Sequence, residues 1–237
     1  MALKACIFSQ NDGYGLYAQD GSILREFSAN AFTQNTEAGI LLSADNVAKL
    51  DAASTFTGGN GRNAVEIMTS ALGGTNDITW SGFADKTPYR VVGYELTVNT
   101  GFILAPGLTV EMTRDAIIRV NNPGYLTAKG TANQKITFTG IQNQASYWKG
   151  IITYSTNDRN VIEHAELSNA GSGILVSGKK AALVVYGGNA KLSVKASRIN
   201  GSGGYGIYVG YGASVNADAA TANTFEANAL SSVMVEK

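Results

Sequence analysis

From about residue 90 onward, short apolar triplets recur along the chain, separated by Gly, Asn or Pro. Many flank a polar residue with two apolar ones, as expected of strands with one buried face, and they return at intervals of about 9 to 18 residues. The triplets lie at 96–98, 108–110, 117–120, 126–128, 136–138, 150–153, 161–167, 183–186, 192–194, 207–209 and 232–235, with an earlier one at 78–80. This spacing predicts coils that each contribute two or three short strands to stacked parallel sheets.

Parallel strands usually need a long crossover, but in a solenoid each turn of the coil is itself the crossover. The pattern therefore predicts an all-β fold, a single-stranded right-handed parallel β-helix that runs through residues 1–237 as one continuous domain. In such a coil, Gly allows a positive φ at the corners, and Asn side chains satisfy backbone groups or form ladders from turn to turn.

Residues 43–61 depart from this pattern. Leu42, Val47 and Leu50 have helical spacing, and Ser43 is placed as an N-cap before Asn46. We expect a short helix or a lateral excursion here, followed by a loop at 58–61.

The two ends of the chain resemble each other. The segment 13–17 (GYGLY) returns as 204–208 (GYGIY), and 30–35 (NAFTQN) matches 223–228 (NTFEAN). The end segments 6–42 and 198–235 are thus predicted to be copies of one unit, although the coils of any solenoid tend to look alike. Both termini would then fall within a solenoid, whose uncapped ends favour head-to-tail self-association.

Composition supports strands and tight turns. The chain has 28 Gly, 3 Pro and only 15% charged residues, with 18 basic and 18 acidic side chains. A net charge of zero gives no field that would attract nucleic acid. The single Cys6 cannot form an internal disulfide, and together with the single His164 it cannot supply a Cys/His zinc site.

The chain contains no apolar run long enough to cross a bilayer, and its first residues are too short for a secretory signal. Two explanations are open: a cytoplasmic protein, or a fragment of a longer exported protein. The internal organisation favours the second, which predicts an extracellular or cell-surface location.

Five segments carry a family resemblance: 124–131, 136–140, 147–151, 160–166 and 169–171. Their order is similar to that in bacterial right-handed parallel β-helix repeat proteins, which share the pectate-lyase-like fold. The resemblance implies an exported surface protein and says little about chemistry, because one fold serves many functions.

A polysaccharide lyase on this fold would need a proton-abstracting base and acidic residues that hold calcium. Lys149, His164 and Glu166 are the nearest approach, with His164 and Glu166 expected on one face of a strand; they would otherwise satisfy turn groups or face water. No acidic cluster is present, so neither a metal site nor a cofactor is predicted, and calcium lacks support. The aspartates a glycosidase needs are dispersed singly.

Aromatic residues are the stronger ligand candidates. Tyr205, Tyr208 and Tyr211 would form a stripe on which sugar rings stack, and Tyr147 with Trp148 would mark a second exposed loop. The alternative is that about half of these side chains pack inside. We therefore expect a noncatalytic structural, adhesive or carbohydrate-binding module whose partner is a glycan or a surface protein, with a lyase as the alternative.

Overall fold

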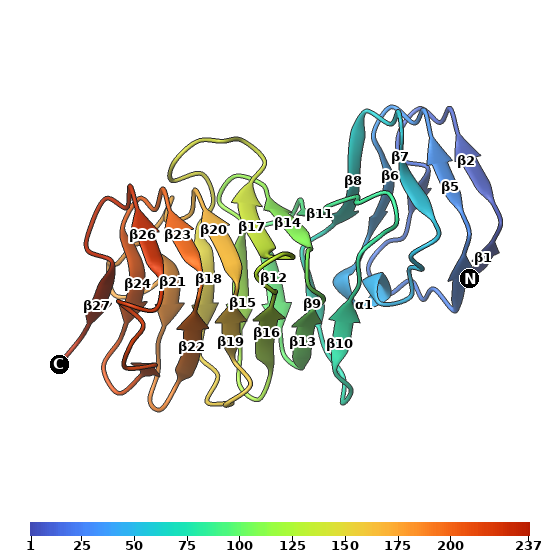
Figure 1. Cartoon of the computed structure of the whole chain (residues 1–237). Helices are drawn as coiled ribbons and strands as arrows, with labels where there is room; N and C mark the ends of the chain where they lie inside the picture. The colour runs from blue at the N-terminus through green and yellow to red at the C-terminus, as the bar shows by residue number, and fades with distance from the viewer.

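The computed structural model describes all 237 residues as a parallel β-solenoid (Figure 1). One sheet runs through the whole molecule and receives a strand from each turn of the coil. In spatial order it contains β3 (Leu16–Tyr17), β6 (Ala38–Leu42), β8 (Arg62–Ile67), β11 (Tyr89–Val91), β14 (Thr109–Met112), β17 (Ile136–Gly140), β20 (Ala165–Ser168), β23 (Arg198–Asn200) and β26 (Thr224–Glu226). We call it the nine-stranded sheet.

Two further sheets complete the coil from residue 70 onward. The seven-stranded sheet contains β9 (Ser70–Leu72), β12 (Glu95–Val98), β15 (Ile117–Val120), β18 (Gly150–Thr153), β21 (Ala181–Val185), β24 (Tyr205–Val209) and β27 (Val233–Val235). The six-stranded sheet contains β10 (Ile78–Trp80), β13 (Gly101–Leu104), β16 (Tyr125–Lys129), β19 (Val161–Glu163), β22 (Lys191–Lys195) and β25 (Ser214–Val215).

The first turns have their own two smaller sheets. One pairs β1 (Ala2–Lys4) with β4 (Glu26–Ser28), and the other contains β2 (Ile7–Ser9), β5 (Ala31–Thr33) and β7 (Thr55–Gly58). Every pairing between strands is parallel, from Ala2 beside Glu26 to Val209 beside Val235. The predicted parallel β-solenoid is therefore confirmed.

Tight corners built on asparagine connect these strands. At both ends of β5 a residue with positive φ, Ala29 or Gln34, precedes an asparagine. The carboxamide oxygen of Asn35 accepts the backbone N–H of Asn11, and Asn60 does the same for Asn35, so the amides form a ladder through successive turns. The interior beside this ladder holds stacked rings: Phe32 lies between Phe8 and Phe56, with centroids 4.8 and 5.2 Å away.

The solenoid has an internal junction between its third and fourth turns. There the two small sheets end and the six- and seven-stranded sheets begin, while the nine-stranded sheet continues through the pairing of β8 with β11. The helix α1 (Ala44–Val47) lies at this junction and contacts β9. Figure 1 shows the N-terminal turns displaced from the rest of the stack. The short helix falls within the segment expected to hold a helix or an excursion.

The structure bears on two expectations about local structure, the strand at 161–167 and the similarity of the two end segments. The stretch 161–167 is not one strand, because His164 adopts a φ of 47° and breaks it into β19 and β20 at a corner. The two similar end segments lie in different sheets: 13–17 leads into β3 of the nine-stranded sheet, whereas 204–208 contains most of β24 of the seven-stranded sheet. Their common origin stays a prediction.

Candidate functional site

The pair Tyr147 and Trp148 does not form an exposed loop, so that expectation is wrong. Trp148 is fully buried and Tyr147 nearly so. The indole N–H of Trp148 donates to the carbonyl of Ser168 at 2.8 Å, and the guanidinium of Arg114 lies 4.8 Å from the centre of the Tyr147 ring. Both residues precede β18, where the chain returns from the loop to the seven-stranded sheet, and their rings are covered by the surrounding chain. Neither ring therefore has an exposed face on which a sugar could stack.

The three tyrosines predicted as a stripe also differ in exposure. Tyr208 is fully buried in a second apolar cluster on the outer face of the seven-stranded sheet, Tyr205 is half-buried beside it, and Tyr211 is 76% exposed. Leu175 and Val176, from the loop that follows β20, pack against this cluster. The tyrosines therefore do not form a continuous exposed platform.

The three weak catalytic candidates do not converge. Lys149 precedes β18 of the seven-stranded sheet, and its side chain runs beneath Gly173. Glu166 points outward from β20 of the nine-stranded sheet and pairs with Lys135 at 2.8 Å. His164 occupies the corner between β19 and β20, so it does not share a strand face with Glu166 as expected.

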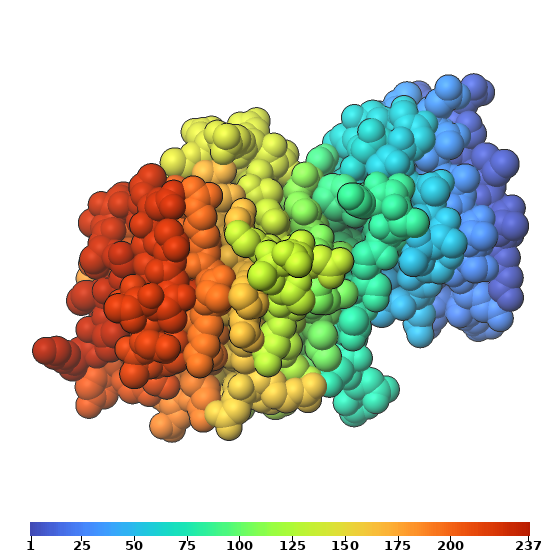
Figure 2. Space-filling view, viewed as in Figure 1, coloured from blue at the N-terminus to red at the C-terminus, as the bar shows by residue number.

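A polar hollow of about 430 Å³ lies on the outer face of the nine-stranded sheet, over β17, β20, β23 and β26. Its lining residues include Glu166, Ser168, Arg198, Asn200 and Glu226 from the strands, and Asn143 and Ala145 from the loop between β17 and β18. Figure 2 shows that loop (yellow, top) rising above the sheet. The strands thus supply the floor and the loop supplies one wall.

Alternating charges cross the floor of this hollow. Arg198 donates to Glu226 at 2.5 Å, and Lys135 pairs with Glu166. The Arg198 guanidinium holds the pKa of the Glu226 carboxyl below its usual range, and Glu226 in turn raises the pKa of Arg198. Glu166, Arg198 and Glu226 line the hollow and are 38–48% exposed, so a ligand in the hollow can reach them.

A second hollow of about 540 Å³ lies nearer the internal junction, and its lining residues include Lys86, Thr87, Thr109, Gln134 and Lys135. Thr109 lies beside Thr137 of the first hollow on neighbouring strands. We call the two hollows together the polar groove. Its lining residues come from turns between the internal junction and the last turn.

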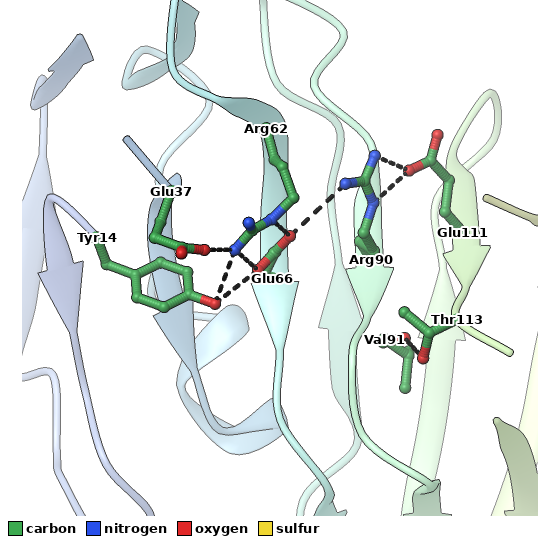
Figure 3. A network of polar contacts seen from close by, with 8 residues as sticks. All are labelled: Tyr14, Glu37, Arg62, Glu66, Arg90, Val91, Glu111 and Thr113. Atoms are coloured by element: carbon green, nitrogen blue, oxygen red, sulfur yellow. Dashed lines mark hydrogen bonds and ion pairs between the residues drawn. The ribbon is translucent and has the colours of Figure 1, made fainter. Parts of the chain in front are cut away.

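A different set of charged residues lies on the same sheet face near the junction (Figure 3). Arg62 pairs with both Glu37 and Glu66, Arg90 pairs with Glu111 at 2.7 Å, and Arg90 also lies 3.6 Å from Glu66. The Glu66 side chain is only 1% exposed. We call these five residues, with Tyr14, the junction ladder.

Tyr14 completes the junction ladder. Its hydroxyl donates to Glu66 at 2.9 Å and accepts from Arg62 at 3.0 Å. Burial and the neighbouring Glu66 carboxylate raise the pKa of Tyr14 to about 12, and hydrogen bonding to Glu66 raises the pKa of Arg62. The ladder joins residues of consecutive turns at the one place where two of the three sheets are interrupted.

The groove residues Lys135, Arg198 and Glu226 were not singled out from the sequence. The only signal would have been polar residues at outward positions of successive triplets.

No group of three or more His, Cys, Asp or Glu side chains is placed to hold a metal ion, and no helix is long and apolar enough to cross a membrane. Comparisons of the chain with protein-family models, with curated proteins and with solved structures found no match.

Proposed function

We propose that the chain is a noncatalytic carbohydrate-binding or adhesive module of an exported bacterial protein, and that it holds a glycan along the polar groove. The observation that supports this most is the composition of the groove floor, where carboxylates, guanidinium, amide and hydroxyl groups alternate over four successive strands. The extracellular location rests on the internal organisation of the sequence and on the family resemblance.

The chemistry of the groove favours a neutral, polyhydroxylated ligand. In the polar groove Lys135 pairs with Glu166 and Arg198 pairs with Glu226, so that only Lys86 adds an uncompensated charge and the groove has little net charge with which to select an ionic polymer. Carboxylates accept hydrogen bonds, Arg and Lys donate them, and Asn does both, which matches the mixed donors and acceptors of sugar hydroxyls. Strands spaced about 4.8 Å apart repeat this pattern along the groove.

The test is a binding screen against neutral and acidic polysaccharides that also records product release. We expect Arg198→Ala to weaken binding of the best glycan at least about tenfold, which corresponds to about 1.4 kcal/mol. Arg119→Ala is the matched control, because Arg119 also pairs with a glutamate, Glu95 at 2.9 Å, but lies on the seven-stranded sheet.

Three outcomes would overturn the proposal. The first is an absence of glycan binding, and the second is an equal loss of binding in both variants. The third is release of unsaturated sugar products, which would replace the binding module with the lyase alternative.

A further inference from the structure

A line of cations and exposed apolar side chains follows one edge of the seven-stranded sheet. Its members lie on the segments that lead into four neighbouring strands of this sheet, β12, β15, β18 and β21. Tyr94, Lys149 and Lys180 directly precede β12, β18 and β21, and Arg114 lies at the corner before β15. We call the following six residues the basic edge: Tyr94, Arg114, Lys149, Ile174, Lys179 and Lys180.

Backbone hydrogen bonds between turns place these segments side by side. The carbonyl of Tyr94 accepts the N–H of Ile117, and the carbonyl of Ala116 accepts the N–H of Lys149. The carbonyl of Lys149 in turn accepts the N–H of Gly171, at the start of the loop that carries the last three members. The basic edge is therefore continuous over four successive turns.

The four cations of the basic edge form no ion pair, unlike the arginines of the junction ladder and Arg198 of the groove. The segments 140–149 and 169–182 contain no acidic residue. Neighbouring carboxylates are engaged elsewhere, since Glu95 pairs with Arg119 at 2.9 Å and Asp115 accepts from the hydroxyl of Ser172 at 2.6 Å. Although the whole chain has no net charge, this edge has a local excess of positive charge.

Two large apolar side chains project from the same edge. Tyr94 is 81% exposed and Ile174 is 60% exposed. The next two residues of the loop, Leu175 and Val176, pack against the apolar cluster on the outer face of the seven-stranded sheet, so the loop is held in place while Ile174 faces solvent. Exposed apolar groups beside uncompensated cations are typical of surfaces that bind anionic lipid, where the cations contact headgroups and the apolar groups enter the interface.

We propose that the basic edge binds the surface of an anionic lipid membrane. Its four cations contact the lipid headgroups, and Tyr94 and Ile174 insert between them. A soluble acidic polymer would match the cations but leave both apolar side chains in water, so a lipid surface fits the edge better. Because the turns of a solenoid are stacked, the edge can meet a plane with several turns at once. The polar groove lies on the nine-stranded sheet, so this inference does not depend on the proposed glycan binding.

The test is cosedimentation of the whole chain with phosphatidylcholine vesicles, prepared with and without phosphatidylserine. We expect binding only to the vesicles that contain phosphatidylserine, and we expect it to weaken as the salt concentration rises. The double variant Lys179→Glu/Lys180→Glu should bind at least about thirtyfold more weakly, because each cation near an anionic surface adds about fivefold to the affinity. Ile174→Ser should weaken binding about tenfold, since it removes an apolar group that enters the interface.

Each variant has a matched control that should bind like the native chain. Lys49→Glu/Lys195→Glu reverses two exposed lysines away from the edge, and Ile23→Ser replaces an isoleucine that is 68% exposed in the first turns. The proposal is overturned if the native chain does not bind phosphatidylserine vesicles, binds pure phosphatidylcholine equally well, or loses as much affinity in the controls. It is also overturned if soluble polyglutamate binds as tightly as the vesicles and Ile174→Ser has no effect, which would indicate an acidic protein partner instead.

Discussion

The junction ladder and the polar groove lie on the outer face of the same nine-stranded sheet and use the same residue types, yet they differ in exposure. In the junction ladder Glu66 is 1% exposed and lies between Arg62 and Arg90. In the groove, Arg198 and Glu226 are 41% and 48% exposed. The centre of the junction ladder, at Glu66 and Arg90, is thus shielded from solvent, whereas the groove pair is open to it.

This difference determines what each set of charges can do. A buried carboxylate must keep its partners, because an unpaired charge in a poorly solvated site is costly. An exposed ion pair adds little to stability, since water and salt screen it. The junction ladder therefore stabilises the stack where two sheets are interrupted, whereas the groove charges remain available to a ligand.

The largest expected effect is from removing a partner of Glu66. Arg62→Ala takes away the side chain that pairs with Glu66 at 2.7 Å and leaves Arg90 at 3.6 Å. We expect a loss of about 3 kcal/mol in the free energy of unfolding, at the low end of the range for a broken buried ion pair because Arg90 remains. Urea denaturation followed by circular dichroism measures this loss.

Arg198→Ala is the control for this prediction, because it breaks an exposed pair on the same sheet. Its unfolding midpoint should stay close to that of the native chain. A comparable destabilisation by both substitutions would show that burial does not separate the two regions.

The sequence predicts the strands better than it predicts exposure. Strand triplets such as 117–120 and 150–153 coincide with β15 and β18, because alternation and Gly or Asn corners are local signals. The break at His164 was missed because nothing in the local pattern distinguishes a corner with positive φ from a continuing strand. The burial of Trp148 was missed because it depends on where the chain returns to the stack.

The two charged regions could not be assembled from the sequence for a related reason. Glu66, Arg90 and Glu111 are neighbours only because the strand register places them side by side. The offset between paired residues is 24 from Val65 to Tyr89, 21 from Tyr89 to Val110 and 34 from Thr127 to Val161. Since the turn length varies, outward positions of successive turns cannot be aligned without the structure.

A smaller effect is expected for Tyr14→Phe, and it should depend on pH. At neutral pH the variant loses the hydrogen bonds to Glu66 and Arg62, at a cost of about 1 kcal/mol. The pKa of Tyr14 is raised to about 12, against about 10 in an unfolded chain. Between these values the folded protein keeps a proton that the unfolded chain has lost, so this contribution to stability falls as the pH rises from 10 to 12.

The measurement is urea denaturation of both proteins at several pH values from 9 to about 11. The stability difference between the native chain and Tyr14→Phe should shrink as the pH rises, by an amount of the order of 1 kcal/mol after allowance for solvent screening. A difference that stays constant would mean that the Tyr14 hydroxyl is not held protonated by burial and Glu66.

The smallest effect is the response of each region to salt. At about 1 M NaCl the Debye length falls to about 3 Å, so any contribution of the exposed Arg198–Glu226 pair to the free energy of unfolding should vanish. Arg198→Ala and the native chain should then have the same stability in urea denaturation. The loss of stability caused by Arg62→Ala should persist, because the buried Glu66 carboxylate is not accessible to dissolved ions. Urea is the denaturant needed here, since guanidinium would itself supply the salt. If the Arg62→Ala deficit also disappears at high salt, then Glu66 is solvated and the two regions of the sheet are electrostatically alike.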